Sequence, residues 1–288
     1  MIILNERAYV EKILSTGDLG RTPMAALYRV AKYYGAMGCK KAEATERTLE
    51  MLKLCLPEQY DKCCASVTRM VRKAYKEPLY EIDHISINKG EMDKIRALKK
   101  KNLMRLAFAL LCIAKYHMAI KPESNGWIAE PDPEIFKLAN ISARRNMHGL
   151  MLNELMAAGL IEFSKAVSNT SIHVLFMDYT EEELQVSDMR CLGYQVSKYL
   201  RLGRYVPCRV CGELVAIPSS VKSSGLRTCC PAHKEREGKT RVAHCPDCGA
   251  VHITPANTKT DRCPACNEEW RRAKSRADRM STDSSDIA

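Results

Sequence analysis

The sequence Cys208-Arg-Val-Cys211-Gly212 begins a cysteine-rich stretch that ends at Cys263-Pro-Ala-Cys266 and decides the fold of the C-terminal region. Between these two motifs lie Cys230-Pro-Ala-His233 and Cys245-Pro-Asp-Cys248-Gly249. A Cys-x-x-Cys turn presents two sulfur atoms from one tight loop, and two such turns supply the four ligands that Zn²⁺ takes in structural sites. The stretch therefore predicts two bound Zn²⁺ ions.

The four turns pair in order along the chain. The first predicted site has 18 residues between its halves and the second has 14, counted from Cys211 to Cys230 and from Cys248 to Cys263. These motifs resemble the zinc-ribbon family over residues 205–270, which implies two small β-rich units. Four protein ligands leave no open coordination position, so we expect structural rather than catalytic metal. The predicted ligands are Cys208, Cys211, Cys230 and His233, then Cys245, Cys248, Cys263 and Cys266.

One ligand position of the first site has two candidates. Cys229 and Cys230 are adjacent, and the spacing of Cys263-Pro-Ala-Cys266 favours Cys230 together with His233. Cys229 remains an alternative ligand. His244 and His252 are further possible metal ligands, but neither is separated from a neighbouring cysteine of the four turns by two residues.

Residues 83–180 are predicted to alternate helices with short strands. Asn102 is expected to cap an apolar helix through His117, and Ser142 to cap a helix over 143–158 that ends before Gly159. The remaining predictions are a strand at 127–129, a helix at 134–138 and two strands at 160–167 and 171–177. This order resembles the winged-helix superfamily, whose members bind DNA, RNA or protein.

The helix over 143–158 is the predicted nucleic-acid reader. Helical periodicity places His148, Met151, Leu152 and Leu155 on its packed face. Polar side chains on the opposite face can contact base edges or phosphates, and Lys165 in the following strand can contact phosphates. The outward residues are Arg144, Arg145, Asn146 and Asn153, with Gly149 permitting close approach of the backbone. Leu150 also faces outward, which favours a protein partner instead.

The flanking regions complete a fold class that is mainly α. Residues 1–82 are predicted to form a helical bundle, and residues 21–80 resemble the helical C-terminal module of mobile-element primases, although a generic bundle is the favoured interpretation. Residues 181–204 are predicted to hold an acidic linker at Glu181–Glu183 and a connecting helix. Beyond the second ribbon, residues 271–288 are predicted as a basic helix, with Arg271 and Arg272, and a disordered tail.

Composition narrows the classes of partner. The formal net charge is +11, from 45 basic and 34 acidic residues, which favours a polyanion as partner. The 14 cysteines suit zinc ligands and free thiols in a reducing cytoplasm. The N-terminus shows no signal-peptide pattern, and the apolar run 106–114 is too short to span a bilayer. We expect a cytoplasmic protein without a membrane partner.

No arrangement typical of an active site occurs in the chain, so we predict that it is not an enzyme. The leading hypothesis is a zinc-containing nucleic-acid-binding protein, with DNA favoured over RNA, acting in phage or mobile-element replication or transcription control. The order of the three regions resembles uncharacterised phage-encoded proteins. The alternative is a non-enzymatic adaptor or inhibitor that docks on a polymerase, helicase or nuclease.

Overall fold

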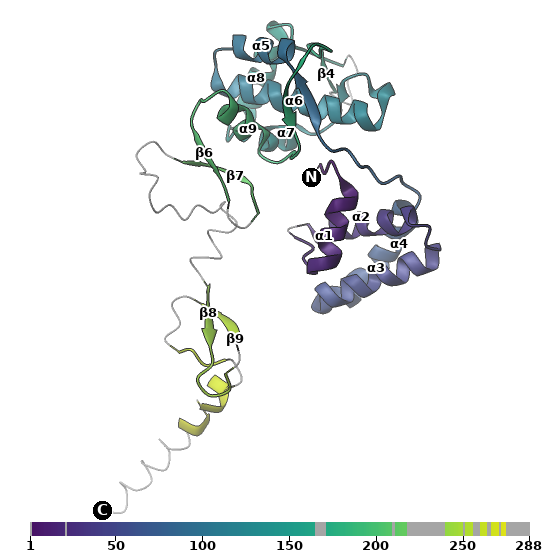
Figure 1. The fold of residues 1–288 in the computed structure, drawn as a ribbon, viewed down its shortest axis with the longest axis vertical. Coiled ribbons are helices and arrows are strands. Elements are labelled where there is room, and N and C mark those ends of the chain that lie inside the picture. The colour runs from purple at the N-terminus through teal and green to yellow at the C-terminus, as the bar shows by residue number, and fades with distance from the viewer. Residues whose placement is uncertain are drawn as a thin grey trace, which may run out of the picture. The chain divides into compact units, whose positions relative to one another are not determined.

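The computed structural model forms two compact units, residues 1–202 and 203–288 (Figure 1). It describes residues 2–20, 22–164, 171–208, 211–217, 240–249, 251–255, 260–263, 266–270 and 272–274. These residues are mainly helical, with four small antiparallel sheets of two or three strands. The mainly α fold class predicted from the sequence is confirmed at this level.

The first part of the N-terminal unit is a helical bundle. Its apolar stripes meet in one core, in which Leu27, Val30 and Val71 are fully buried. Glycine at position 17 adopts φ +67°, the left-handed conformation that ends a helix. The elements are α1 (Glu6–Thr16), α2 (Pro23–Ala36), α3 (Lys41–Cys55), η1 (Pro57–Gln59) and α4 (Tyr60–Ala74).

The start of α1 is fixed by a cap and by a buried ion pair. The Asn5 side chain accepts a hydrogen bond from the backbone N–H of Ala8 at 2.8 Å, as its N-cap position predicts. Glu6 forms an ion pair with Lys32 of α2 and accepts from the backbone N–H of Tyr80 at 3.1 Å. These contacts close the bundle, because they join its first helix to the segment that follows α4.

The second part of the N-terminal unit surrounds one long helix, α6 (Lys101–Ile120). A two-stranded sheet pairs β1 with β5, and a three-stranded sheet has the order β2-β4-β3. The other elements are β1 (Ile85–Asn88), α5 (Lys89–Ala97), η2 (Pro122–Ser124), β2 (Trp127–Ile128), α7 (Asp132–Leu138), α8 (Arg145–Ala157), β3 (Ile161–Phe163), β4 (Ile172–Val174), β5 (Glu182–Val186) and α9 (Leu192–Tyr199).

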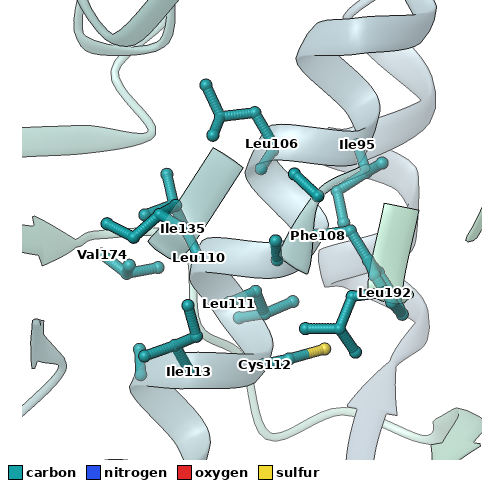
Figure 2. Close-up of a cluster of buried hydrophobic side chains, with 14 of the residues drawn as sticks. Ile95, Leu106, Phe108, Leu110, Leu111, Cys112, Ile113, Ile135, Val174 and Leu192 are labelled. Atoms are coloured by element: carbon teal, nitrogen blue, oxygen red, sulfur yellow. The ribbon is translucent and has the colours of Figure 1, made fainter. Parts of the chain in front are cut away.

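Helix α6 is apolar on most of its surface because neighbouring elements cover it. Phe108, Leu110 and Leu111 are fully buried, and side chains from α7, β4 and α9 pack around them (Figure 2). Helix α6 is long and apolar enough to cross a membrane, but it is largely buried inside the protein. A long apolar helix that is buried in this way is typical of the core of a globular domain.

Two predicted helix caps are wrong. Helix α6 begins at Lys101 with Lys100 at the N-cap position, so Asn102 lies within its first turn. Helix α8 begins at Arg145 rather than Ala143, and Ser142 lies before its N-cap residue, Arg144. In both cases the side chain that was expected to cap is exposed and outside the cap position, because packing of the apolar face sets where the helix begins.

The predicted linker at 181–204 is also corrected. Glu182–Val186 is strand β5, which pairs antiparallel with β1 and brings Val186 opposite Ile85. Helix α9 (Leu192–Tyr199) packs against α6, with Leu192 and Val196 fully buried. Residues 182–199 therefore complete the core of the N-terminal unit instead of connecting two domains.

Candidate metal centre and basic surfaces

The best-defined candidate site lies in the C-terminal unit and begins with a β-hairpin. Strands β8 (Thr240–His244) and β9 (Val251–Pro255) pair antiparallel, and the segment between them holds Cys245 and Cys248. The backbone N–H of Gly249 donates to the carbonyl oxygen of Cys245 at 2.9 Å, which closes a tight turn. Gly249 has φ +72°, a backbone conformation that residues other than glycine rarely adopt.

A second turn brings two more thiols to the hairpin. The backbone N–H of Asn267 donates to the carbonyl oxygen of Cys263 at 2.9 Å, and residues 266–270 are helical. The Arg262 guanidinium forms an ion pair with Asp247 at 2.6 Å, joining the second turn to the first. Cys263 and Cys266 are thereby held facing Cys245 and Cys248.

The four sulfur atoms lie close enough to hold one metal ion. Those of Cys245, Cys248, Cys263 and Cys266 all lie within 4.8 Å of one another, and the Cys248–Cys263 separation is 3.8 Å. A tetrahedral site with Zn–S bonds of about 2.3 Å also requires sulfur atoms about 3.8 Å apart. The donor set therefore fits a structural metal site with four protein ligands.

The environment of the thiols favours binding of a cation. Hydrogen bonding from the backbone N–H of Cys263 lowers the pKa of Cys245 to about 6, so this sulfur is largely a thiolate at neutral pH. Hydrogen bonds with the neighbouring cysteine side chains, of which that with Cys263 has the largest effect, raise the pKa of Cys266. Four adjacent thiols cannot all ionise without a positive charge between them, and a divalent metal ion supplies that charge.

The first predicted metal site is described only in part. Strands β6 (Arg204–Pro207) and β7 (Leu214–Ile217) form a hairpin around Cys208 and Cys211, with the backbone N–H of Gly212 donating to Cys208 at 2.9 Å. This turn has the same arrangement as the one at Cys245, including a glycine at positive φ (+74°). The expected partners Cys230 and His233, and the alternative Cys229, lie outside the described residues.

Helix α8 presents its two faces as its periodicity predicts. His148, Met151, Leu152 and Leu155 are buried, and the His148 ring stacks on Phe136 of α7 at 3.7 Å between centroids. The opposite face is not uniformly polar, because Met147 and Leu150 are 43% and 55% exposed. The predicted contact residues Arg144, Arg145, Asn146 and Asn153 are all exposed.

The remaining predicted contact residues are separated from this helix in the chain. Arg272 is exposed and forms an ion pair with Glu268, one helical turn before it. Lys165 and Arg271 lie outside the residues whose side chains the structure describes. The structure therefore shows that the three polar residues of α8 and its N-cap residue Arg144 are exposed, and it leaves Lys165 and Arg271 untested.

Sequence reasoning did not identify Arg262 as a residue of interest. Its guanidinium lies 5.0 Å from the ring centroid of Trp270, and the Lys274 amine lies 5.4 Å from the same centroid. The available signal was the position of Arg262 directly before a metal-ligand turn, which fixes it close to the helix after Cys266.

Comparison of the chain with known proteins found no matching family model, curated protein or solved structure.

Proposed function

We propose that this protein is a zinc-containing nucleic-acid-binding protein, with DNA as the favoured partner. It would act without catalysing a reaction, in the cytoplasm, during replication or transcription control of a phage or mobile element. The observation that carries this proposal is α8, which buries His148 and Leu155 and turns Arg144, Arg145 and Asn146 to solvent. Arginine and asparagine side chains on such a helix contact phosphates and base edges.

The surroundings of α8 support a winged-helix assignment. The elements follow the order α6, β2, α7, α8, β3 and β4, and β4 lies between β2 and β3 in the sheet. In a winged helix the third helix enters the major groove and the strands that follow it form the wing. We assign α6, α7 and α8 to the three helices and β3 and β4 to the wing.

The metal centre has a structural role in this proposal. We assign Zn²⁺ to Cys245, Cys248, Cys263 and Cys266, whose sulfur atoms lie within 4.8 Å. A second Zn²⁺ would be held by Cys208 and Cys211 with Cys230 and His233, because the two hairpins share one turn geometry. Both sites would form zinc ribbons that stabilise basic surfaces beside the nucleic acid.

A salt-titrated binding assay tests the α8 surface. The double variant Arg144→Ala, Arg145→Ala is expected to bind duplex DNA about tenfold more weakly or worse near physiological salt, since removing one arginine side chain from the interface costs about 1 kcal/mol or more. The slope of log affinity against log salt should also fall by about 1 for each phosphate that is no longer neutralised. Fluorescence anisotropy of a labelled duplex at several salt concentrations measures both quantities.

The control removes the same charge elsewhere. Lys12 of α1 and Lys41 of α3 are exposed, so Lys12→Ala with Lys41→Ala lowers the net charge by the same amount without touching α8. We expect this control to bind nearly as well as the unmodified protein. Equal weakening in both double variants would show a non-specific charge effect. Absence of binding to duplex DNA, single-stranded DNA and RNA at low salt would exclude the proposed function.

The exposed apolar residues of α8 favour a second candidate function, a protein adaptor. Met147 and Leu150 are exposed on the same helix as the polar contact residues, and exposed apolar groups, methionine in particular, are typical of protein interfaces. In this case the partner would be a replication or transcription protein. The double variant Met147→Ala, Leu150→Ala would then lose partner binding while keeping the salt-dependent binding of nucleic acid.

A further inference from the structure

A tryptophan with two nearby cations lies beside the metal centre. Trp270 lies four residues after Cys266, in the helical segment 266–270, and its side chain remains 43% exposed. Arg262 and Lys274 approach its ring at 5.0 Å and 5.4 Å from the centroid. The protein contains only one other tryptophan, Trp127.

The local structure holds these three residues in place. Arg262 directly precedes the ligand Cys263, and its ion pair with Asp247 fixes the guanidinium against the first metal-ligand turn. Lys274 follows Trp270 by four residues, the spacing that places two side chains on one face of a helix. The geometry of the patch therefore depends on the same turns that bring the four thiols together.

An indole that served only to fill a core would be buried, and this one is not. Each nearby cation contributes about 0.5–1 kcal/mol at an exposed aromatic ring, which helps to orient the Trp270 side chain while 43% of it remains exposed. A nucleobase that stacks on such a ring contributes about 1–3 kcal/mol, and an adjacent phosphate can pair with the Lys274 amine. Bases inside a duplex are stacked on both faces, so only unpaired bases can reach the indole.

We infer that Arg262, Trp270 and Lys274 form a docking patch for single-stranded nucleic acid. One unpaired base stacks on Trp270, and the Lys274 amine binds a phosphate that flanks it, while Arg262, paired with Asp247, holds the indole in position. The inference rests on the proposed function in taking nucleic acid as the partner, but it assigns a second surface with a different strand preference from α8. Stacking does not require a particular base, so the patch binds with little sequence preference.

Tryptophan fluorescence tests this patch in the full-length, metal-loaded protein. Trp127→Phe keeps an aromatic ring against His173, on which Trp127 stacks, and leaves Trp270 as the single tryptophan reporter. We expect saturable quenching of its emission by oligo(dT) and by oligo(U), and much weaker quenching by a duplex of equal length. Heparin, a polyanion without bases, should bind without comparable quenching. Unchanged emission at saturating oligo(dT), or stronger quenching by duplex, would overturn the inference.

Substitutions provide an independent measurement. Trp270→Ala is expected to weaken binding of oligo(dT) about tenfold, within the range for loss of one stacked base. Lys274→Glu changes an exposed side chain that is not one of the candidate metal ligands, and it should weaken the same binding several-fold with unchanged metal content. If both variants keep their metal and bind oligo(dT) as tightly as the unmodified protein, the patch is not the docking surface.

The outcomes also separate this inference from the proposed function. Arg144→Ala with Arg145→Ala should leave the quenching of Trp270 by oligo(dT) unchanged, because α8 does not belong to the patch. Duplex binding that depends on α8 without any response of Trp270 to single strands would contradict only the inference. Failure of every nucleic acid to bind would contradict both.

Discussion

Gly193→Ala is expected to destabilise the N-terminal unit by about 3 kcal/mol, the upper part of the usual range for overpacking. A Cβ atom at this position would lie 1.7 Å from the carbonyl oxygen of Ala139 and 2.4 Å from its carbonyl carbon. Backbone atoms cannot rotate aside as a side chain would, so α9 must move away from Ala139, the residue at the C-terminal end of α7. Because Leu192 and Val196 are fully buried, that movement exposes core surface.

Thermal and urea unfolding, followed by far-ultraviolet circular dichroism, measure this destabilisation. A change of this size should lower the melting temperature of a unit of about 200 residues by roughly 10 °C. Gly149→Ala is the matched control, because nothing lies within 4 Å of the added methyl group in α8. That substitution should instead stabilise by about 0.5–1 kcal/mol, since alanine favours a helix over glycine. Equal stability of the two variants would show that α9 is not seated against Ala139.

Cys248→Ser is expected to abolish metal binding at the four-cysteine centre and to unfold the segment around it. Among the residues of the C-terminal unit whose burial the structure describes, only Tyr205, Cys208 and Cys245 are buried, and two of these three are cysteines of the candidate metal-binding turns. Structural zinc contributes an apparent free energy of about 10–16 kcal/mol in small zinc-dependent folds. Loss of one ligand therefore removes most of the stabilising free energy of this part of the chain.

Elemental analysis of the purified protein measures the metal directly, and limited proteolysis measures the unfolding. We expect two equivalents of zinc in the unmodified protein and one in Cys248→Ser, with rapid cleavage near residues 240–274. The helical circular dichroism signal should change little, because the N-terminal unit has its own core. Cys64→Ser, in α4, removes a thiol that is far from the four-cysteine set in sequence and should leave the metal content unchanged. Full retention of metal by Cys248→Ser would contradict the assignment.

The features predicted correctly from the sequence depend on local geometry. The Cys-x-x-Cys spacing places two sulfur atoms on one turn, and the four cysteines of the second predicted site do converge. Helical periodicity separated the buried face of α8 from its exposed face correctly, because that division depends on residues three and four positions apart. The cap at Asn5 is equally local, since its side chain accepts from the backbone N–H of Ala8, three residues later.

The features that were missed depend on partners distant in the chain. Glu181–Glu183 has the composition of a linker, yet Glu182–Val186 forms β5 because β1 supplies its backbone hydrogen bonds. The carboxylate of Glu183 then accepts hydrogen bonds from the Arg96 side chain at 3.3 Å and from the Tyr199 hydroxyl at 2.6 Å. Arg96 lies 87 positions before Glu183 and Tyr199 lies 16 positions after it, and both stabilise this acidic strand. A local sequence pattern does not reveal such distant partners.

The sequence by itself determined the Cys-x-x-Cys turns and the buried and exposed faces of α8, together with the four thiols of the candidate metal centre. These features depend on residues within a few positions of one another, or on a repeated motif whose two halves have matching chemistry. Only the tertiary structure decided that β5 and α9 complete the core around α6, and that Arg262 lies against Trp270. Such contacts are set by packing and charge pairing between distant segments, which become neighbours only when the chain has folded.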